Sequence, residues 1–289
     1  MTIDVSSVLN ASITPDNSPS NDQSNKNEIK RLNKNPAVSS FRYILTNARS
    51  LTPKIESLLD FFDELDLQMA IITESWLKPG KDLERSLRDL EDGERLKIIH
   101  KSRPSKRNRT AGCGVAIAFN QDKLKLTERP IKAGRAEIIC ATGKLPKMAR
   151  KIVVFAVYIP PKTRAPQVNN IMSTLNDEIS RAKTDLNDPV IIIGGDYNKK
   201  PFHDSVVDFP DVHLLPSGPT RGNETLDLVF TNVTSTTQIK PPLESDDGSL
   251  KSDHSTVLVE SSIGNEHRFE WKFIKSRPKT DRGITSSTR

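Results

Sequence analysis

Residues 189–198 read PVIIIGGDYN, and this stretch decides the fold. A short unbroken apolar run, bounded by a proline and two glycines, is typical of a strand that is buried on both faces. An aspartate and an asparagine follow the run directly. Because sites on layered α/β folds lie at strand ends, we take Asp196 and Asn198 as candidate functional residues.

Similar short strands recur on both sides of this stretch. We predict strands at 41–46, 69–73, 96–100, 114–119, 136–142, 151–158, 226–230, 255–260 and 267–273. Apolar residues at helical spacing predict helices at 53–65 and 166–182. Thr52 is the predicted N-cap of the first helix, with Pro53 at its first position. Strands outnumber helices and the helices fall between strands, which favours a layered α/β protein with largely buried sheets.

The two ends of the chain differ from its middle. Residues 1–40 are rich in Ser, Asn, Asp and Pro and have almost no apolar periodicity. Such a segment buries too little surface to offset the entropy lost on ordering. We therefore predict a disordered polar arm over 1–40, one folded domain over 41–274, and a basic disordered tail over 275–289.

Charge and cysteine usage narrow the class of protein. The formal net charge of +6 is modest: it is compatible with a polyanionic partner, but on charge alone an ordinary basic protein is the more common case. Cys113 and Cys140 lie in apolar runs without metal-ligand spacing, so we predict buried, reduced thiols. No apolar run approaches the roughly 20 residues of a membrane span, and the start does not resemble a signal peptide. We expect a nuclear or cytoplasmic protein without a membrane partner.

Polar residues that could carry chemistry lie at the ends of several predicted strands. They are Asn47, Glu74, Tyr158, Asp196, Asn198, Asp227, Asp253 and His254. Each of them alone also has a structural interpretation, as a turn residue or as a tyrosine bonded to backbone. Asp227 is unusual because it lies in an apolar run, where a carboxylate needs a partner to offset its desolvation.

Taken together, these residues could bind a cation and activate water. A hard divalent cation needs oxygen ligands, which Glu74, Asn47 and Asp253 could supply. Attack on a phosphodiester needs a general base or a group that orients water, and Asp196 or His254 could serve.

The same set could also bind a phosphate group. Asn198, Tyr158 and a protonated His254 are hydrogen-bond donors suited to phosphate oxygens. A histidine in this role usually has an orienting carboxylate, for which Asp227 is the candidate.

Six short motifs then follow one another along the chain. They are NARSL (47–51), ITESWL (72–77), VYIPP (157–161), GGDYN (194–198), PTRGNETLDLVF (219–230) and SDHSTV (252–257). In this order they resemble the signature blocks of the endonuclease/exonuclease/phosphatase superfamily. NARSL and TESWL resemble its non-LTR retrotransposon (LINE-type) endonuclease branch. The resemblance covers about 41–260 and implies a four-layer α/β sandwich, with two packed mixed β-sheets flanked by helices.

The resemblance also implies an activity and a metal. Members of this superfamily cleave phosphoester bonds with Mg²⁺ or Mn²⁺. The retrotransposon branch implies a DNA endonuclease that nicks its target, as in target-primed reverse transcription. By motif match, Asn47 and Glu74 would lie at the metal, with Glu74 as the main ligand and Asp253 assisting.

The catalytic roles that the resemblance implies fall on five residues. Asp227 would hold His254, which would contact the scissile phosphate. Asp196 would position or deprotonate the attacking water, or protonate the leaving oxygen. Asn198 and Tyr158 would bind the phosphate and stabilise the charge that develops on it.

Further residues are candidates for contacts with the substrate. Thr220 matches a threonine near the site, with a minor role. Arg49 stands where repair-type members often carry an acid, which argues against an abasic-site repair enzyme. The segment 95–109 carries seven Lys or Arg and no acid, and is either a solvated mobile loop or an arm that follows DNA phosphates. Its candidate contacts are Arg103, Lys106, Arg107 and Arg109.

These observations favour one function and leave two others open. We expect a monomer that acts on double-stranded DNA, with retrotransposon RNA or reverse transcriptase as further partners. The first alternative is a phosphatase or phosphodiesterase acting on small or lipid phosphoesters, which the basic segment and NARSL weigh against. The second is an inactive remnant that only binds nucleic acid.

Overall fold

The structure is a computed structural model of the full chain. It describes residues 40–78, 87–90, 93–102, 113–131, 137–144, 150–198, 209–233, 252–262 and 268–274. All of them belong to one compact unit, Val38–Arg289. The tail expected over 275–289 and all but the last residue of the arm expected over 1–40 lie outside these residues.

Two six-stranded mixed sheets form the body of this unit. Sheet A joins, in this order, β12 (Arg268–Ile274), β11 (Thr256–Ser262), β1 (Ser40–Asn47), β2 (Met69–Thr73), β4 (Val115–Asn120) and β3 (Leu96–Lys101). Sheet B joins β5 (Lys125–Glu128), β6 (Glu137–Lys144), β7 (Lys151–Tyr158), β8 (Val190–Asp196), β10 (Asp227–Thr231) and β9 (His213–Leu215). The β1–β2 and β7–β8 pairs are parallel, and the other pairs are antiparallel.

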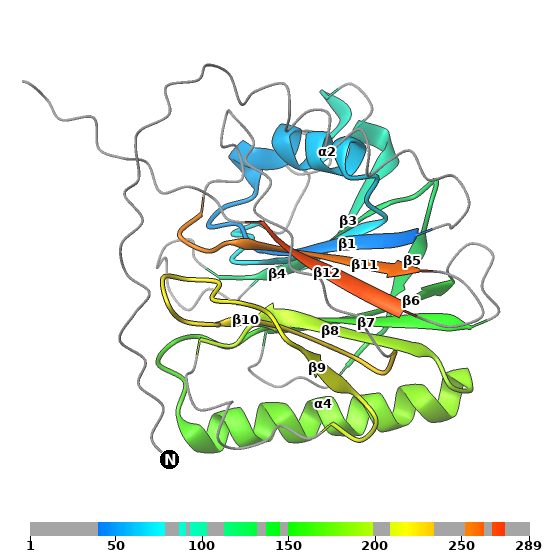
Figure 1. Cartoon of the computed structure of the whole chain (residues 1–289), viewed down its shortest axis with the longest axis vertical. Helices are drawn as coiled ribbons and strands as arrows, with labels where there is room; N and C mark the ends of the chain where they lie inside the picture. The colour runs from blue at the N-terminus through cyan, green and yellow to red at the C-terminus, as the bar shows by residue number, and fades with distance from the viewer. Residues whose placement is uncertain are drawn as a thin grey trace, which may run out of the picture. The chain divides into compact units, whose positions relative to one another are not determined.

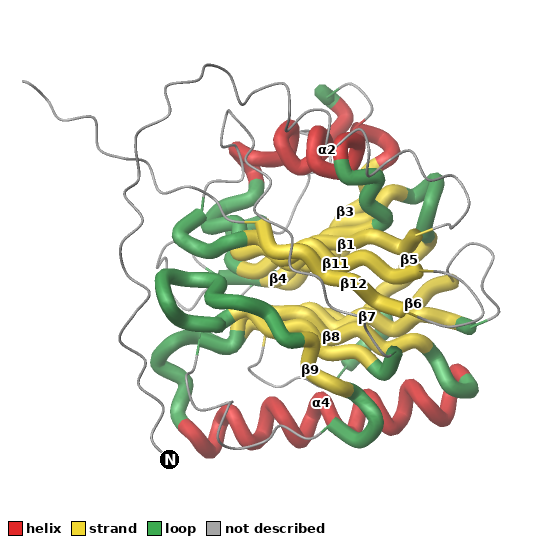
Figure 2. Tube along the Cα trace, in the orientation of Figure 1, coloured by secondary structure: helices red, strands yellow, loops and turns green. Residues whose placement is uncertain are grey.

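Helices cover the outer faces of both sheets. Helix α2 (Ile55–Glu64) packs on sheet A, and α4 (Ala165–Leu186) packs on sheet B (Figures 1 and 2). Two short 3-10 helices, η1 (Thr52–Lys54) and η2 (Gly93–Arg95), lie in the connections. The layers are therefore helix, sheet, sheet, helix, which confirms the predicted four-layer α/β sandwich. Within the described residues, no helix combines the length and apolar character that crossing a membrane requires.

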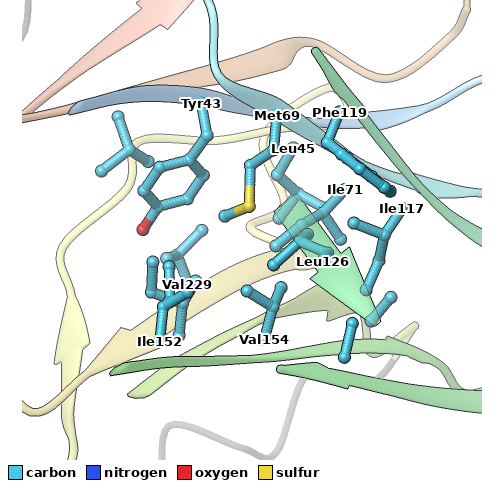
Figure 3. Close-up of a cluster of buried hydrophobic side chains, with 14 of the residues drawn as sticks. Tyr43, Leu45, Met69, Ile71, Ile117, Phe119, Leu126, Ile152, Val154 and Val229 are labelled. Carbon is cyan, nitrogen blue, oxygen red and sulfur yellow. The ribbon is translucent and has the colours of Figure 1, made fainter. Parts of the chain in front are cut away.

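The main core lies between the two sheets. Sheet A contributes Tyr43, Leu45, Met69, Ile71, Ile117 and Phe119, and sheet B contributes Leu126, Ile152, Val154 and Val229 (Figure 3). These side chains occupy alternate positions along their strands, because successive residues of a strand point to opposite faces. The inner faces are thus apolar along most of their length.

Strand β8 shows why its sequence is an unbroken apolar run. Val190 and Ile192 face sheet A, whereas Ile191 and Ile193 pack in the cluster under α4. Both faces of the strand are covered, so neither alternate row can be polar. Val190–Asp196 is buried at every position.

The helix boundaries differ from the expected ones at Thr52 and after residue 182. Thr52 is the first residue of the 3-10 turn η1 and not its N-cap. The N-cap is Leu51, whose side chain has no acceptor for the free N–H groups and whose own N–H donates to the carbonyl of Ser75. Helix α4 continues to Leu186 and ends where Asn187 takes a left-handed φ of 52°. Two strands were not predicted, β5 and β9, because both are short and largely exposed.

Neither cysteine forms a disulfide within the described residues, and their surroundings differ. Cys140 is buried in the cluster under α4, as predicted, whereas Cys113 is only partly buried. Burial raises the pKa of the Cys140 thiol to about 12, with acidic neighbours adding to the effect and Arg129 opposing it.

Candidate functional site

The apolar inner faces of the two sheets end in polar residues at one edge. The alternate row that holds Tyr43 and Leu45 in β1 continues to Asn47. In sheet B, the same alternation places Tyr158 and Asp196 at the inner-face ends of β7 and β8. The loops after β1 and before β10 and β11 lie on the left of Figure 1, at this edge.

Three neighbouring strands of sheet B bring their polar residues into register. Tyr158 in β7 pairs with Asp196 in β8, and Asp196 pairs with Asp227 at the start of β10. Cross-strand partners point to the same face of a sheet and lie close together. A phenol and two carboxylates are therefore side by side at the inner edge of sheet B.

Side-chain hydrogen bonds join these groups to residues carried by sheet A. The amide Nδ2 of Asn47 donates to Asp196 Oδ2 at 3.0 Å, Tyr158 OH donates to Glu74 Oε1 at 3.2 Å, and His254 Nδ1 lies 2.7 Å from Asp227 Oδ2. In each pair, one residue comes from sheet B and the other from sheet A or a loop beside one of its strands. Six of the predicted site residues are thus brought together at one place.

The loops at this edge contain residues with strained backbone conformations, and backbone hydrogen bonds join these loops to one another. Positive φ angles occur at the non-glycine residues Arg49, Ser50, Glu74, Trp76, Cys113 and Asn198. Ser50 N–H donates to Glu74 O, and Ser75 N–H donates to Gly114 O, so the loops are bonded to one another. Strained residues of this kind persist where the surroundings over-determine them, which is common at functional sites.

Asp196 is fully buried and close to a second carboxylate. Its Oδ2 accepts from Asn47, and its Oδ1 accepts the N–H of Asn198 at 3.0 Å. Burial, followed by the charge of Asp227, raises the pKa of Asp196 to about 7, although His254 and the two hydrogen bonds oppose the shift. Near neutral pH this group can therefore exchange a proton.

The His254 ring is held in place by Asp227. Burial alone would lower the pKa of His254, but the hydrogen bond and charge of Asp227, with the charges of Asp196 and Asp253, raise it overall. The bond is made at Nδ1, so the ring presents Nε2 on its other side. The raised pKa favours the protonated ring, in which Nε2 would also carry a proton and could donate a hydrogen bond.

Thr220 connects the backbones on both sides of the histidine–aspartate pair. Its side chain is only 1% exposed, and its hydroxyl accepts the N–H groups of Leu226 at 2.9 Å and Asp227 at 3.1 Å. Its carbonyl accepts the N–H of Ser255, next to His254. Thr220 thus supports the catalytic candidates through the backbone, and its expected contact with substrate stays a prediction.

The donor set at this edge fits a divalent cation. Asp196, Asp227 and His254 each offer a ligand atom, and these atoms lie within 4.8 Å of one another. Asp227 Oδ1 is buried and has no hydrogen-bond partner among the described residues. An orphaned carboxylate oxygen beside a second carboxylate is the environment that a hard cation stabilises. Glu74 and Asn47, the predicted ligands, reach the same edge through their bonds to Tyr158 and Asp196.

Asp253 lies at the rim of the site and is paired with two arginines. Its Oδ1 is 3.3 Å from Arg49 Nη1, and its Oδ2 is 2.6 Å from Arg221 Nη2. Partial burial acts to raise the pKa of Asp253, but the charges of Arg221, His254 and Arg49 lower it overall. Both carboxylate oxygens are therefore engaged, and its metal-ligand role stays a prediction.

Asn198 also offers an orphaned group. Its Nδ2 is buried and lacks a partner within the part of the chain that the structure describes. A buried amide donor without an acceptor suits an incoming oxyanion. The expected contacts of the basic segment, at Arg103, Lys106, Arg107 and Arg109, lie outside the described residues.

A family model described as the endonuclease/exonuclease/phosphatase family matches residues 37–254, about three quarters of the chain. The chain belongs to this family. Members of the endonuclease/exonuclease/phosphatase family are hydrolases, so the coarse prediction of a nuclease or phosphatase is confirmed. No curated protein sequence matches the chain.

Solved structures with the same fold span several kinds of protein. Truncated TDP2 of Caenorhabditis elegans is 12% identical, with 77% of this chain and 97% of that one covered and a TM-score of 0.53. The endonuclease domain of TRAS1, a telomere-specific non-LTR retrotransposon, is 14% identical, with 76% and 97% covered and a TM-score of 0.50. A mannosyl-6-phosphatase of Bacteroides thetaiotaomicron is 12% identical, with 66% and 85% covered and a TM-score of 0.50. At these identities the likeness shows the fold alone.

Sequence reasoning missed residues that position others. Arg221, and Ser252, whose Oγ accepts the N–H of His254 at 3.2 Å, were not singled out. Both lie inside quoted motifs, PTRGNETLDLVF and SDHSTV, next to or near a candidate residue. Adjacency to a candidate was the signal available, but nothing in the sequence indicated that Arg221 and Arg49 meet at Asp253.

Proposed function

We propose that this chain is a Mg²⁺- or Mn²⁺-dependent endonuclease that hydrolyses DNA phosphodiester bonds and nicks one strand, like the endonucleases of non-LTR retrotransposons. The observation that carries the proposal is the buried group of Asp196, Asp227 and His254, joined to Asn47 at one edge of the sandwich. Such a group combines a buried carboxylate that can exchange a proton with a histidine that a second carboxylate holds in place.

The phosphate would be bound by three donors. His254, oriented by Asp227 and with its pKa raised, would place Nε2 on a non-bridging oxygen of the scissile phosphate. Asn198 would use its unpaired Nδ2, and Tyr158 its hydroxyl, to stabilise charge that develops on the same group.

Asp196 would accept the proton of the attacking water or donate one to the leaving oxygen. Its bond from Asn47 fixes the carboxylate, and its pKa of about 7 suits a group that takes a proton from water or returns one to the leaving oxygen. A bound Mg²⁺ would supply positive charge against the phosphate. In this proposal Glu74 and Asn47 hold it with Asp253 assisting, and Asp196 and His254 stay available for the proton and the phosphate.

Two considerations support DNA as the substrate. The NARSL and TESWL motifs resemble the retrotransposon branch, and the TRAS1 endonuclease domain shares the fold. Arginines also gather at the rim of the site. The mannosyl-6-phosphatase of the same fold keeps a small phosphoester as the second candidate.

The test is conversion of supercoiled plasmid to open circle with Mg²⁺ and with EDTA. Wild-type protein should nick only with the metal, and Glu74→Ala, Asp196→Ala and His254→Ala should each abolish nicking. His213→Ala is the matched control, because His213 is an exposed histidine in β9. Persistent nicking by His254→Ala would refute the mechanism, and turnover of a small phosphoester without nicking would favour the second candidate.

A further inference from the structure

Two arginines from distant parts of the chain converge on one carboxylate at the rim of the site. Arg49 follows β1, Arg221 lies in the turn before β10, and Asp253 pairs with both of them. Their side chains are 53% and 49% exposed, so both guanidinium groups face solvent. Lys54, whose ammonium donates to the carbonyl of Ala48, lies near enough for burial and the charge of Arg49 to lower its pKa while the charge of Asp253 opposes the shift. We call Arg49, Lys54, Arg221 and Asp253 the rim cluster.

The rim cluster is fastened to the catalytic candidates by short links. The N–H of Arg49 donates to Asn47 Oδ1 at 3.2 Å, and Asn47 holds Asp196. Arg221 is next to Thr220, whose hydroxyl accepts the N–H of Asp227. Asp253 directly precedes His254 in the chain. The two arginines therefore have a defined position relative to any phosphate bound at His254.

The ion pairs within the rim cluster can exchange for a phosphate. Exposed ion pairs are weak, because water and salt screen them. Arginine binds phosphate in a planar, two-pronged geometry, and a polyanion gains further from releasing its counterions. Two guanidinium groups share the single carboxylate of Asp253, so a phosphate that replaces this carboxylate would take up two donors at once.

We propose that Arg49 and Arg221, gathered on Asp253, bind the backbone phosphate next to the scissile one and so select polynucleotides over isolated phosphoesters. This inference rests on the proposed endonuclease function and names the residues that set its substrate class. A polynucleotide carries a second phosphate beside the one under attack, whereas a single phosphoester does not. Asp253 keeps the two arginines at the rim until that phosphate arrives.

The test uses the full chain with Arg49→Gln, Arg221→Gln and the double variant. Arg150→Gln is the control, since Arg150 lies at the opposite end of β7 from Tyr158 and pairs with an exposed aspartate. Binding of a fluorescent duplex oligonucleotide is measured in EDTA at several salt concentrations. Loss of one phosphate contact should weaken binding about tenfold at low salt and reduce the slope of log K against log salt by about one.

A second arm compares cleavage of the oligonucleotide with hydrolysis of bis(4-nitrophenyl) phosphate. In the double variant, kcat/KM for the oligonucleotide relative to the small diester should fall about tenfold, and Arg150→Gln should match wild type in both arms. If wild type nicks DNA and the double variant keeps its salt slope and its substrate ratio, the inference is overturned while the proposed function stands. If no DNA is cleaved but the slope changes, hydrolysis is refuted and the phosphate contact is supported.

Discussion

Replacing Gly195 with alanine should damage this fold far more than the same change at Gly194. A Cβ built on Gly195 would lie 1.9 Å from the backbone oxygen of Val157 and 2.8 Å from its carbonyl carbon. This distance is more than 1 Å below the 3.0 Å under which real Cβ atoms are essentially never found, and a backbone carbonyl cannot rotate away as a side chain can. A Cβ on Gly194 would instead meet the terminal methyl of Ile71 at 2.7 Å, where a flexible side chain can adjust.

The expected magnitudes follow from these contacts. Overpacking usually costs about 1–3 kcal/mol, and a clash with backbone in a buried parallel pair should reach at least the upper end. For a domain of this size about 1 kcal/mol corresponds to 2–4 °C in Tm, so Gly195→Ala should lower Tm by about 6–12 °C or more. Gly194→Ala should stay within about 4 °C of wild type, because the smaller clash is offset by lower entropy of the unfolded chain. Neither glycine has a positive φ, so strain does not confuse the comparison.

The assay is thermal unfolding followed by far-UV circular dichroism in EDTA. Any Gly195→Ala protein that folds should also lose activity, because β8 would shift against β7 and Asp196 follows Gly195 directly. If Gly195→Ala melts within about 4 °C of wild type, or Gly194→Ala is the less stable of the two, the steric reasoning is refuted.

Three further outcomes are expected. Asp196→Asn should raise Tm in EDTA at pH 8. Burial and the Asp227 charge raise the Asp196 pKa to about 7, so wild type loses stability as pH rises from about 4 to about 7. The gain in Tm of the variant over wild type should therefore be smaller at pH 5 than at pH 8. An equal gain in Tm at both pH values would contradict this reasoning. Thr220→Val should cost about 2–5 kcal/mol in urea unfolding, because two buried N–H groups lose their acceptor, and Thr220→Ser should restore most of it. Iodoacetamide at pH 8 should label Cys113 before Cys140 in native protein, as read by mass spectrometry, because burial keeps the Cys140 thiol protonated; early labelling of Cys140 would argue against that burial.

The sequence predicted most strands because apolar runs are a local signal, whereas the four-layer arrangement was implied by the family resemblance. Apolar runs such as PVIIIG have few other interpretations, and the two missed strands, β5 and β9, bury only one side chain each. The N-cap predicted at Thr52 was wrong, because the N–H groups of Ser50 and Leu51 donate to carbonyls of the loop after β2 and the helical turn already begins after Leu51. Such bonds depend on contacts between distant segments, which sequence patterns do not encode.

For the candidate site, the residue types were predictable but their partners were only partly so. The Asp227–His254 pair was expected from the motifs, and the structure contains that contact. The bond between Asn47 and Asp196 was not expected, because it depends on how two sheets meet across 149 residues of sequence. The meeting of Arg49 and Arg221 at Asp253 has the same origin.

Three hydrogen bonds at the site each join a residue of sheet B to a residue of sheet A or of a loop beside it. They are Asn47–Asp196, Glu74–Tyr158 and Asp227–His254. Neither sheet alone contains both partners of any of these bonds, even when all of its own strands are paired. Competence for catalysis would therefore require the two sheets to be packed against each other. Turnover by this chain would thus report on the packing of the two sheets, and a substitution that separates them would abolish it without touching a site residue.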